Sequence, residues 1–137
     1  MKTLKSTLLF LVFATVIIFS SCNKNEDDSS KGAFSNGIFI INEGPFKTGT
    51  GTITFYNPDS NLVRQDIFEM VNHRPLGNIA QSMTIYNGKG YIVVNNAGKV
   101  EVVDVATFKS EATITNLVNP SQFLVIDAAK AYVSDWI

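Results

Sequence analysis

From Gly37 onward the chain alternates apolar and polar residues in short runs rich in Val, Ile, Tyr, Phe and Thr. A period of two is typical of β-strands with one buried face, and no stretch sustains the roughly 3.6-residue period of a helix. Turn-forming sequences such as Asn87-Gly88 separate the runs. The pattern predicts an all-β chain, with strands at residues 37–41, 51–56, 62–68, 80–86, 90–95, 99–104, 109–115, 121–126 and 130–135.

Part of this pattern repeats 41 residues further along the chain. The segment GKGYIVVNN at residues 88–96 matches AKAYVSDWI at residues 129–137, and Tyr91 takes the position of Tyr132. A third copy, which carries a loop insertion, aligns residues 37–42 with 90–95 and residues 51–57 with 98–104. Four strands recurring at about this spacing indicate the blades of a β-propeller.

Three segments resemble a known family: GIFIINEG, HRPLGNIAQSMTIYNGKGYIVVNNAGKVEVVD and AKAYVSD. Over residues 37–137 the chain is similar to the YVTN-type β-propellers, which usually have seven blades, and among them to surface lipoproteins of Bacteroidetes. The resemblance implies an incomplete β-propeller domain with about two and a half four-stranded blades. Because a closed propeller needs at least about four blades, we expect the sequence to be a fragment of a longer chain. Assembly of several short chains into one ring is the alternative.

The residues before this domain have the layout of a secretory signal. Lys2 and Lys5 precede an apolar run, Leu8–Phe19, which is interrupted only by Thr15. The run is shorter than the roughly 20 residues that a membrane-spanning helix needs. Residues 19–22, FSSC, resemble a bacterial lipobox, so we expect a lipoprotein signal peptide at 1–21 and a lipid anchor to the membrane on Cys22. The alternative is a buried or incidental thiol.

Residues 22–36 follow as an expected disordered acidic tether. Residues 23–30 are polar, acidic at their centre and without an apolar residue to bury. They resemble the export signal of lipoproteins that reach the outer face of the outer membrane, which implies a lipid-anchored protein at the cell surface. The alternative is a solvated linker that leaves the protein facing the periplasm.

The charge balance excludes some partners. The chain has 11 Lys and Arg residues against 12 Asp and Glu residues, and its formal net charge is −1. The basic residues are scattered singly, so we expect no nucleic-acid partner.

Catalytic motifs are sparse. His73 is the only histidine, which excludes a multi-histidine metal site, and no nucleophile elbow is present. We therefore expect no metal, no cofactor and no enzymatic activity. Asp104 and Asp127 stand at strand ends, where aspartate usually caps its own backbone, and Tyr91 and Tyr132 are expected to pack between blades.

A ligand site is expected at one end of the blades, because antiparallel pairing brings the loops between blades to the same end as the central loop of each blade. The loops concerned are residues 42–50, 70–78, 95–98, 116–120 and 135–136. The candidate ligand-binding residues on them are Asn42, Glu43, Phe46, Asn72, His73, Arg74, Asn95, Asn96 and Trp136.

Within this set, Asn42, Asn95 and Trp136 take equivalent repeat positions, and a rigid aromatic beside amides suits a flat or sugar-like ligand. Trp136 could instead pack between blades. Residues 72–74 carry a cation that could meet a phosphate or carboxylate, with ordinary solvated loop chemistry as the alternative. Phe46 is either an exposed contact or an anchor folded back onto its loop.

The expected function is a surface lipoprotein binding module that captures a small nutrient ligand. The resemblance implies a corrinoid or a glycan as the ligand and a TonB-dependent outer-membrane transporter as the partner, because the family includes corrinoid-capturing propellers that sit over cobalamin transporters. One alternative is a propeller scaffold that binds a protein. Another is a propeller enzyme of the lyase or quinoprotein kind, with its active site in missing blades.

Overall fold

The computed structural model describes residues 32–136. They belong to one compact unit, Lys31–Ile137. The expected signal peptide, Cys22 and most of the expected tether lie outside the described residues. Among residues 32–136 there is no helix with the length and apolar character needed to cross a bilayer.

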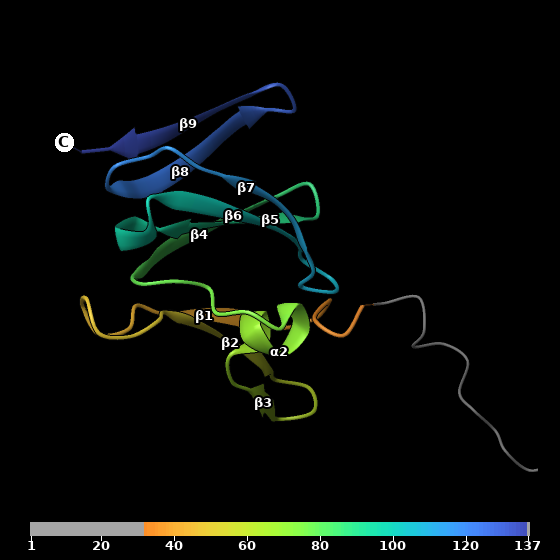
Figure 1. Cartoon of the computed structure of the whole chain (residues 1–137). Coiled ribbons are helices and arrows are strands. Elements are labelled where there is room, and N and C mark those ends of the chain that lie inside the picture. The colour runs from red at the N-terminus through yellow and green to blue at the C-terminus, as the bar shows by residue number, and fades with distance from the viewer. Residues whose placement is uncertain (1–31, 137) are drawn as a thin grey trace, which may run out of the picture. The chain divides into compact units, whose positions relative to one another are not determined.

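Three antiparallel sheets make up the unit, which confirms the all-β class (Figure 1). The first sheet contains β1 (Ile38–Asn42), β2 (Thr52–Asn57) and β3 (Leu62–Arg64), in that order. The second contains β4 (Ala80–Tyr86), β5 (Lys89–Val94), β6 (Lys99–Asp104) and β7 (Ser110–Ile114). The third pairs β8 (Pro120–Asp127) with β9 (Lys130–Asp135). Within each sheet consecutive strands are neighbours, and within the described residues no sheet closes on itself.

Turn chemistry fixes the hairpins. Tyr86 pairs with Lys89, so Asn87-Gly88 is a two-residue loop, and both of its residues have positive φ, 48° and 76°. This is the backbone that the right-handed twist of paired strands favours, and Asn and Gly tolerate it at low cost. Gly98 likewise has a φ of 59° where it ends the 3₁₀ helix η2 (Asn95–Ala97) before β6.

One expected strand is partly wrong. The strand expected over 62–68 ends at Arg64, and a short helix, α2 (Ile67–Asn72), follows it. Ile67 and Phe68 are both buried. Adjacent residues of a strand face opposite sides, whereas a helix can direct both toward one core. The carboxylate of Asp66 accepts a hydrogen bond from the N–H of Glu69 and caps the first turn.

The larger core fills the space between the first and second sheets. Its buried residues come from both sheets, from α2 and from the connections around them. They are Phe34, Ile53, Phe55, Ile67, Phe68, Leu76, Ala80, Ile92, Val94, Val103 and Phe108.

The position of Phe34 shows that the expected tether, residues 22–36, extends too far toward the C-terminus. It is buried, and its ring meets those of Phe55 and Phe108 edge-on at centroid distances of 5.2 and 5.8 Å. Its N–H donates to the carbonyl of Ala106 at 3.0 Å. Residues 32–36 therefore belong to the packed unit, because Phe34 supplies an apolar ring that the core requires.

A smaller core joins the second and third sheets. Val93, Val100 and Phe123 are buried there. The ring of Tyr91 stacks on that of Phe123 with 4.7 Å between centroids and 11° between planes, so this tyrosine packs between two sheets. Tyr132, for which the same packing was expected, is 54% exposed in the described residues. The hydroxyls of Ser82 and Thr84 donate to the carbonyls of Ser121 and Phe123 at 2.8 and 2.7 Å. These two sheets are thus joined by side chains.

The pairing of the strands shows that Asn42 is not equivalent to Asn95 and Trp136 in the repeat, although the sequence alignment indicates that it is. Asn42 pairs with Thr52, as Val94 pairs with Lys99. Asn42 therefore matches Val94, and Glu43 is the residue that matches Asn95. Because side chains alternate between the two faces of a strand, this shift of one residue places Asn42 on a sheet face and not in the series of Asn95 and Trp136.

Candidate functional site

One end of the sheets carries the loops expected to bind a ligand. At the left of Figure 1 lie the connection between β1 and β2, the helix η2, the connection between β7 and β8, and the end of β9. We call this the loop end and define it as residues 43–51, 77–79, 95–98, 115–119 and 135–136. The turns between β4 and β5 and between β8 and β9 lie at the opposite end (Figure 1).

Asn78 ties the connection between β1 and β2 to the rest of the loop end. Its Nδ2 donates to the carbonyls of Pro45 and Gly49 at 3.0 and 2.6 Å. Its Oδ1 accepts from the N–H of Lys47 at 3.3 Å and from Nδ2 of Asn96 at 2.9 Å. One carboxamide therefore joins the connection at residues 45–49 to η2.

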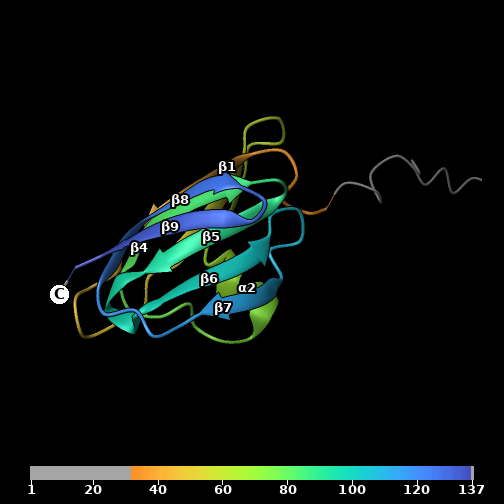
Figure 2. The same cartoon turned by 90° about the horizontal axis from the view of Figure 1, so that it is seen from above.

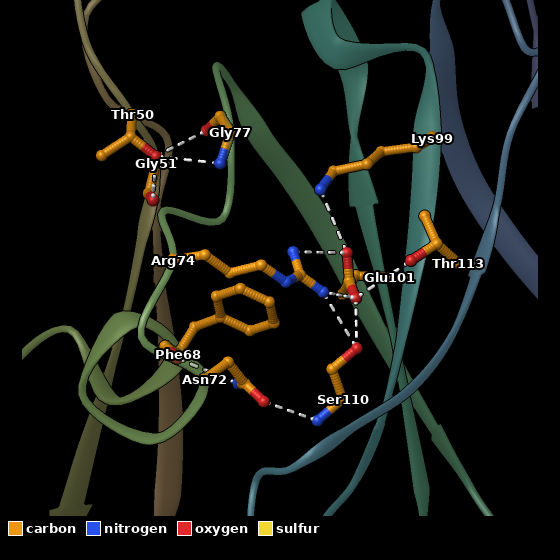
Figure 3. Close-up of polar contacts among 10 residues, drawn as sticks. All are labelled: Thr50, Gly51, Phe68, Asn72, Arg74, Gly77, Lys99, Glu101, Ser110 and Thr113. Atoms are coloured by element: carbon orange, nitrogen blue, oxygen red, sulfur yellow. Dashed lines mark hydrogen bonds and ion pairs between the residues drawn. The ribbon is translucent and has the colours of Figure 1, made fainter.

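A second tie holds the base of the same connection. The hydroxyl of Thr50 bonds to both the N–H and the carbonyl of Gly77 at 2.9 Å, and the N–H of Gly51 donates to that carbonyl at 2.7 Å (Figure 3). Backbone held at both ends in this way has few conformations open to it.

Phe46 lies on this fixed connection and is 63% exposed. Its ring does not anchor the loop, which leaves the exposed-contact alternative. The ammonium of Lys47 lies 5.1 Å from the ring centroid, a cation–π distance. An exposed aromatic on an ordered backbone loses little conformational entropy when a ligand covers it.

Trp136 is also exposed, at 66% of its surface, so within the described residues its indole is not covered by a neighbouring sheet. Asp135 orders its surroundings, because its carboxylate accepts from the N–H groups of Val118 and Asn119 at 2.8 and 2.6 Å. Nδ2 of Asn119 donates to the carbonyl of Trp136 at 3.1 Å. The loop end thus presents two ordered aromatic side chains, Phe46 and Trp136.

The candidate amides are already engaged within the protein. Nδ2 of Asn95 donates to the carbonyl of Pro120 at 2.8 Å, and Nδ2 of Asn96 is bonded to Asn78. Asn42 donates to the hydroxyls of Thr52 and Thr54. Glu43 is exposed, and its backbone carbonyl accepts a hydrogen bond from the N–H of Ala80 at 3.1 Å. The amides of Asn95 and Asn96 therefore help to hold the loop end together.

Asn72, His73 and Arg74 do not join this group. Asn72 donates to the carbonyl of Phe108, in the connection between β6 and β7, and accepts from the N–H of Ser110 at the start of β7 (Figure 3 shows the bond to Ser110). His73 has a φ of 54° and ends α2, with its N–H donating to the carbonyl of Glu69. Of the expected loop 70–78, only the last residues reach the loop end.

Arg74 is engaged with a buried carboxylate that sequence reasoning missed. Glu101 lies in β6 with no exposed surface, and Nη2 of Arg74 donates to its Oε1 at 2.5 Å (Figure 3). Lys99 Nζ donates to the other oxygen at 3.0 Å, while the hydroxyls of Ser110 and Thr113 donate to Oε1. The sequence feature that could have revealed this buried charge is the position of Glu101 among the valines of the segment VEVVD.

These donors decide the charge of Glu101. Burial disfavours the ionised form and is the largest single influence, but the hydrogen bonds from Arg74, Ser110 and Lys99 outweigh it together. They hold the pKa of Glu101 below its ordinary value of 4.5. Because every acceptor site is occupied and Arg74 also lies over the ring of Phe68, at 4.9 Å, this cluster fastens residue 74 to the second sheet.

The two aspartates at strand ends cap their own turns, as expected. The carboxylate of Asp104 accepts from the N–H and the hydroxyl of Thr107, and these bonds hold the pKa of Asp104 below its ordinary value. Asp127 accepts from the N–H of Ala129 at 2.8 Å. Over residues 32–136, no three His, Cys, Asp or Glu side chains are grouped as a metal site requires.

Comparison with known proteins gives one match. The model of the family described as "Domain of unknown function (DUF5074)" matches residues 36–136. None of the curated proteins matches the chain.

Proposed function

The chain belongs to the DUF5074 family, and we propose that it is a binding module that captures a small ligand at the loop end. One observation carries this proposal: Phe46 and Trp136 are both exposed on backbone that is fixed by internal hydrogen bonds. Exposed aromatic rings on ordered loops are the side chains on which binding energy concentrates.

The side chains favour a ligand with a flat or ring-shaped apolar face. Aromatic rings stack on such faces, and the carbonyl oxygens of Asn95 and Asn96 can accept hydrogen bonds from hydroxyls or amides at the ligand's edge. Corrinoids and glycans both have this combination. We propose these two classes as the ligands.

We also propose that the three sheets are blades of a β-propeller. The first two are antiparallel meanders and the third is a two-stranded hairpin, and they pack in the order of the sequence. The stacking of Tyr91 on Phe123 between the second and third sheets supports this assignment. The resemblance to YVTN-type propellers supports the same assignment.

The leader and tether give the proposed location. We propose a lipid anchor on Cys22 and a position at the outer membrane, on the cell surface, where the module would pass its ligand to a TonB-dependent transporter. The support is the apolar leader, the FSSC segment and the acidic residues that follow it.

Calorimetric titration tests the ligand proposal directly. The full chain, kept in mild detergent because of its apolar leader, is titrated with cyanocobalamin and separately with a panel of oligosaccharides. We expect binding by one of these classes, and we expect Phe46→Ala and Trp136→Ala each to weaken it about tenfold or more. Because Trp136 is the only tryptophan, its fluorescence gives a second signal.

The matched control is Tyr86→Ala. Tyr86 is an exposed aromatic next to the Asn87-Gly88 turn, at the end opposite the loop end. Its removal should leave the affinity unchanged. Equal losses in all three variants, or binding that survives both loop-end substitutions, would move the site away from the loop end.

A further inference from the structure

We propose that the buried Glu101 is a positioning residue of the loop-end ligand site: through the connection between α2 and β4, residues 73–79, it fixes the place at which Phe46 is presented. This inference rests on the proposed function, because it concerns the same site. Glu101 acts through residues of the connection between α2 and β4, some bonded to the carboxylate and others bonded to the loop that carries Phe46.

The connection between α2 and β4 joins two distant parts of the unit. It begins at α2, which Figure 2 shows close to β7, the last strand of the second sheet, and it ends at the loop end, where β4 starts (Figure 1). Near its beginning Arg74 is bonded to Glu101, and further on Gly77 is bonded to Thr50 (Figure 3). Only two residues separate these fastenings, and one of them, Leu76, is buried. Because so short a span has few conformations open to it, a displacement of Arg74 should reach Gly77.

Lys99 makes a second contact between the carboxylate and the same connection. Its Nζ donates to Oε2 of Glu101 at 3.0 Å. The carbon chain of Lys99 lies beside Gly77, where an added Cβ atom would be 3.6 Å from Cε of the lysine. Gly77 has a φ of 121°, a conformation open mainly to glycine. Glu101 therefore holds two side chains, those of Arg74 and Lys99, that bear on the connection between α2 and β4.

Backbone strain marks the end of this connection. Ile79 is buried and has a φ of 64°. That region is sterically costly for a β-branched residue, and such residues persist only where the surrounding structure holds them, often at functional sites. In this conformation the carbonyl of Ile79 accepts from the N–H of Asn95 at 2.8 Å. The preceding residue, Asn78, is bonded to the loop that carries Phe46. The strained backbone thus joins two segments of the loop end, and the fastening at residue 74 helps to hold it.

A stable core does not by itself account for a buried carboxylate. An ion pair away from water is weak evidence for stability, since apolar residues of similar volume are often as stabilising. What the pair provides is a fixed direction. Two nitrogens of Arg74 donate to the two oxygens of Glu101, at 3.4 and 2.5 Å, and the hydroxyls of Ser110 and Thr113 donate to one of the same oxygens. Paired bonds of this kind add geometric specificity, so they define where residue 74 lies on the second sheet.

Hydrogen exchange of the full chain in mild detergent tests the coupling without a ligand. We expect the amides of residues 43–50 to exchange about threefold faster or more in Glu101→Gln than in the natural chain. The matched control is Val100→Ala. Val100 is the neighbouring residue of β6 and is buried in the smaller core, on the other face of the second sheet. This control lowers stability without touching the carboxylate, so the exchange of residues 43–50 relative to that of the second sheet should stay unchanged.

Calorimetric titration with cyanocobalamin and with the oligosaccharide panel measures the effect on binding. Glu101→Gln and Arg74→Met should each weaken binding about threefold or more, although neither residue belongs to the loop end. Arg74→Lys keeps the cation and should recover part of the affinity. Val100→Ala should bind as the natural chain does. Circular dichroism shows whether each variant is folded, and Arg74→Met supplies both measurements if Glu101→Gln does not fold.

The two measurements separate this inference from the proposed function. If the natural chain binds neither class of ligand, the proposed function fails, and the exchange of residues 43–50 alone decides whether Glu101 positions that segment. Exchange that rises no more in Glu101→Gln than in Val100→Ala overturns the inference. Unchanged affinity in Glu101→Gln and Arg74→Met, with a ligand that the natural chain binds, also overturns it, because the connection would then position nothing that the ligand touches.

Discussion

At the scale of single residues, Glu101 shows how a buried charge is tolerated in an apolar sheet. Transfer of a carboxylate out of water is costly unless the charge is paired and hydrogen-bonded. Arg74 and Lys99 supply the opposite charges, and Ser110 and Thr113 fill the remaining acceptor positions. Loss of this carboxylate leaves two cations facing each other without a counter-charge.

We therefore expect Glu101→Gln to lower the free energy of unfolding by about 2 kcal/mol near pH 7, as for hydrogen bonds to charged groups. The matched control is Glu111→Gln, which removes an exposed ion pair with Lys89 and should cost clearly less, because water screens exposed charges. Urea unfolding followed by circular dichroism measures both. Equal costs in the two variants would contradict the distinction between buried and exposed pairs.

The same residue predicts a pH dependence. The pKa of Glu101 is lowered in the folded protein, so as the pH falls below about 4.5 the unfolded chain takes up the proton first. The stability that ionised Glu101 contributes is thus present above that pH and is lost as the pH falls through the folded-state pKa. The difference between the natural chain and Glu101→Gln should shrink below pH 4.5, whereas a constant difference would exclude this titration. Asp104 titrates in the same direction in both proteins and cancels.

Residue roles were predictable from the sequence where the partner is close in the chain. The caps formed by Asp104 and Asp127 reach only two or three residues ahead. Arg74 finds its partner 27 residues away, which only the packing of the connection after α2 against the second sheet determines. The sequence predicted that the guanidinium of Arg74 would bind a ligand, but it forms an ion pair with Glu101. Arg74→Ala should therefore lower the free energy of unfolding.

At the scale of elements, the strands followed from alternation and the turns from Asn and Gly. The helix α2 did not, because a helical period cannot be established over six residues. The connection between β1 and β2 was located correctly, but its rigidity depends on Asn78, about 30 residues further along. No local sequence pattern predicts hydrogen bonds between residues so far apart in the chain.

The tie made by Asn78 gives a prediction for that connection. Asn78→Ala removes hydrogen bonds to Pro45, Gly49 and Lys47, so amides in residues 43–50 should exchange with deuterium faster and stability should fall by about 1 kcal/mol. Hydrogen exchange read by mass spectrometry measures this. Asn36→Ala, which removes one exposed bond to Asp59, is the control and should leave that exchange unchanged. Unaltered exchange in Asn78→Ala would mean that Thr50 and Gly77 hold the connection alone.

At the scale of the whole molecule, Cys22 is the predicted tether. If it carries lipid, Cys22→Ala should release the chain from membranes, while Ser30→Ala, in the acidic segment, should leave it bound. Membrane fractionation and intact-mass analysis read the result. An unmodified chain cleaved at another residue would refute the anchor.

The succession of sheets was predictable from the repeat, but the exact register was not. Matching residue types aligned Asn42 with Asn95, whereas strand pairing aligns it with Val94. A sequence repeat is aligned by the similarity of its side chains, whereas the register of a strand is set by its hydrogen bonds to the neighbouring strand. A difference of one residue between the two alignments places a side chain on the opposite face of the sheet. The sequence therefore predicted the all-β class and the order of the strands better than the members of the candidate site.

The joining of the second and third sheets by side chains has an evolutionary consequence. The pair Leu124 and Tyr132 encloses one residue more than the pair Thr84 and Tyr91, and irregular register in β8 absorbs the difference. A hydrogen-bonded ladder running through both sheets would pass such an insertion on to every later strand. Here Tyr132 keeps the place that Tyr91 has. Duplicated repeats of this kind can gain or lose single codons independently, so the gene can diverge sheet by sheet while the neighbouring sheets keep their packing.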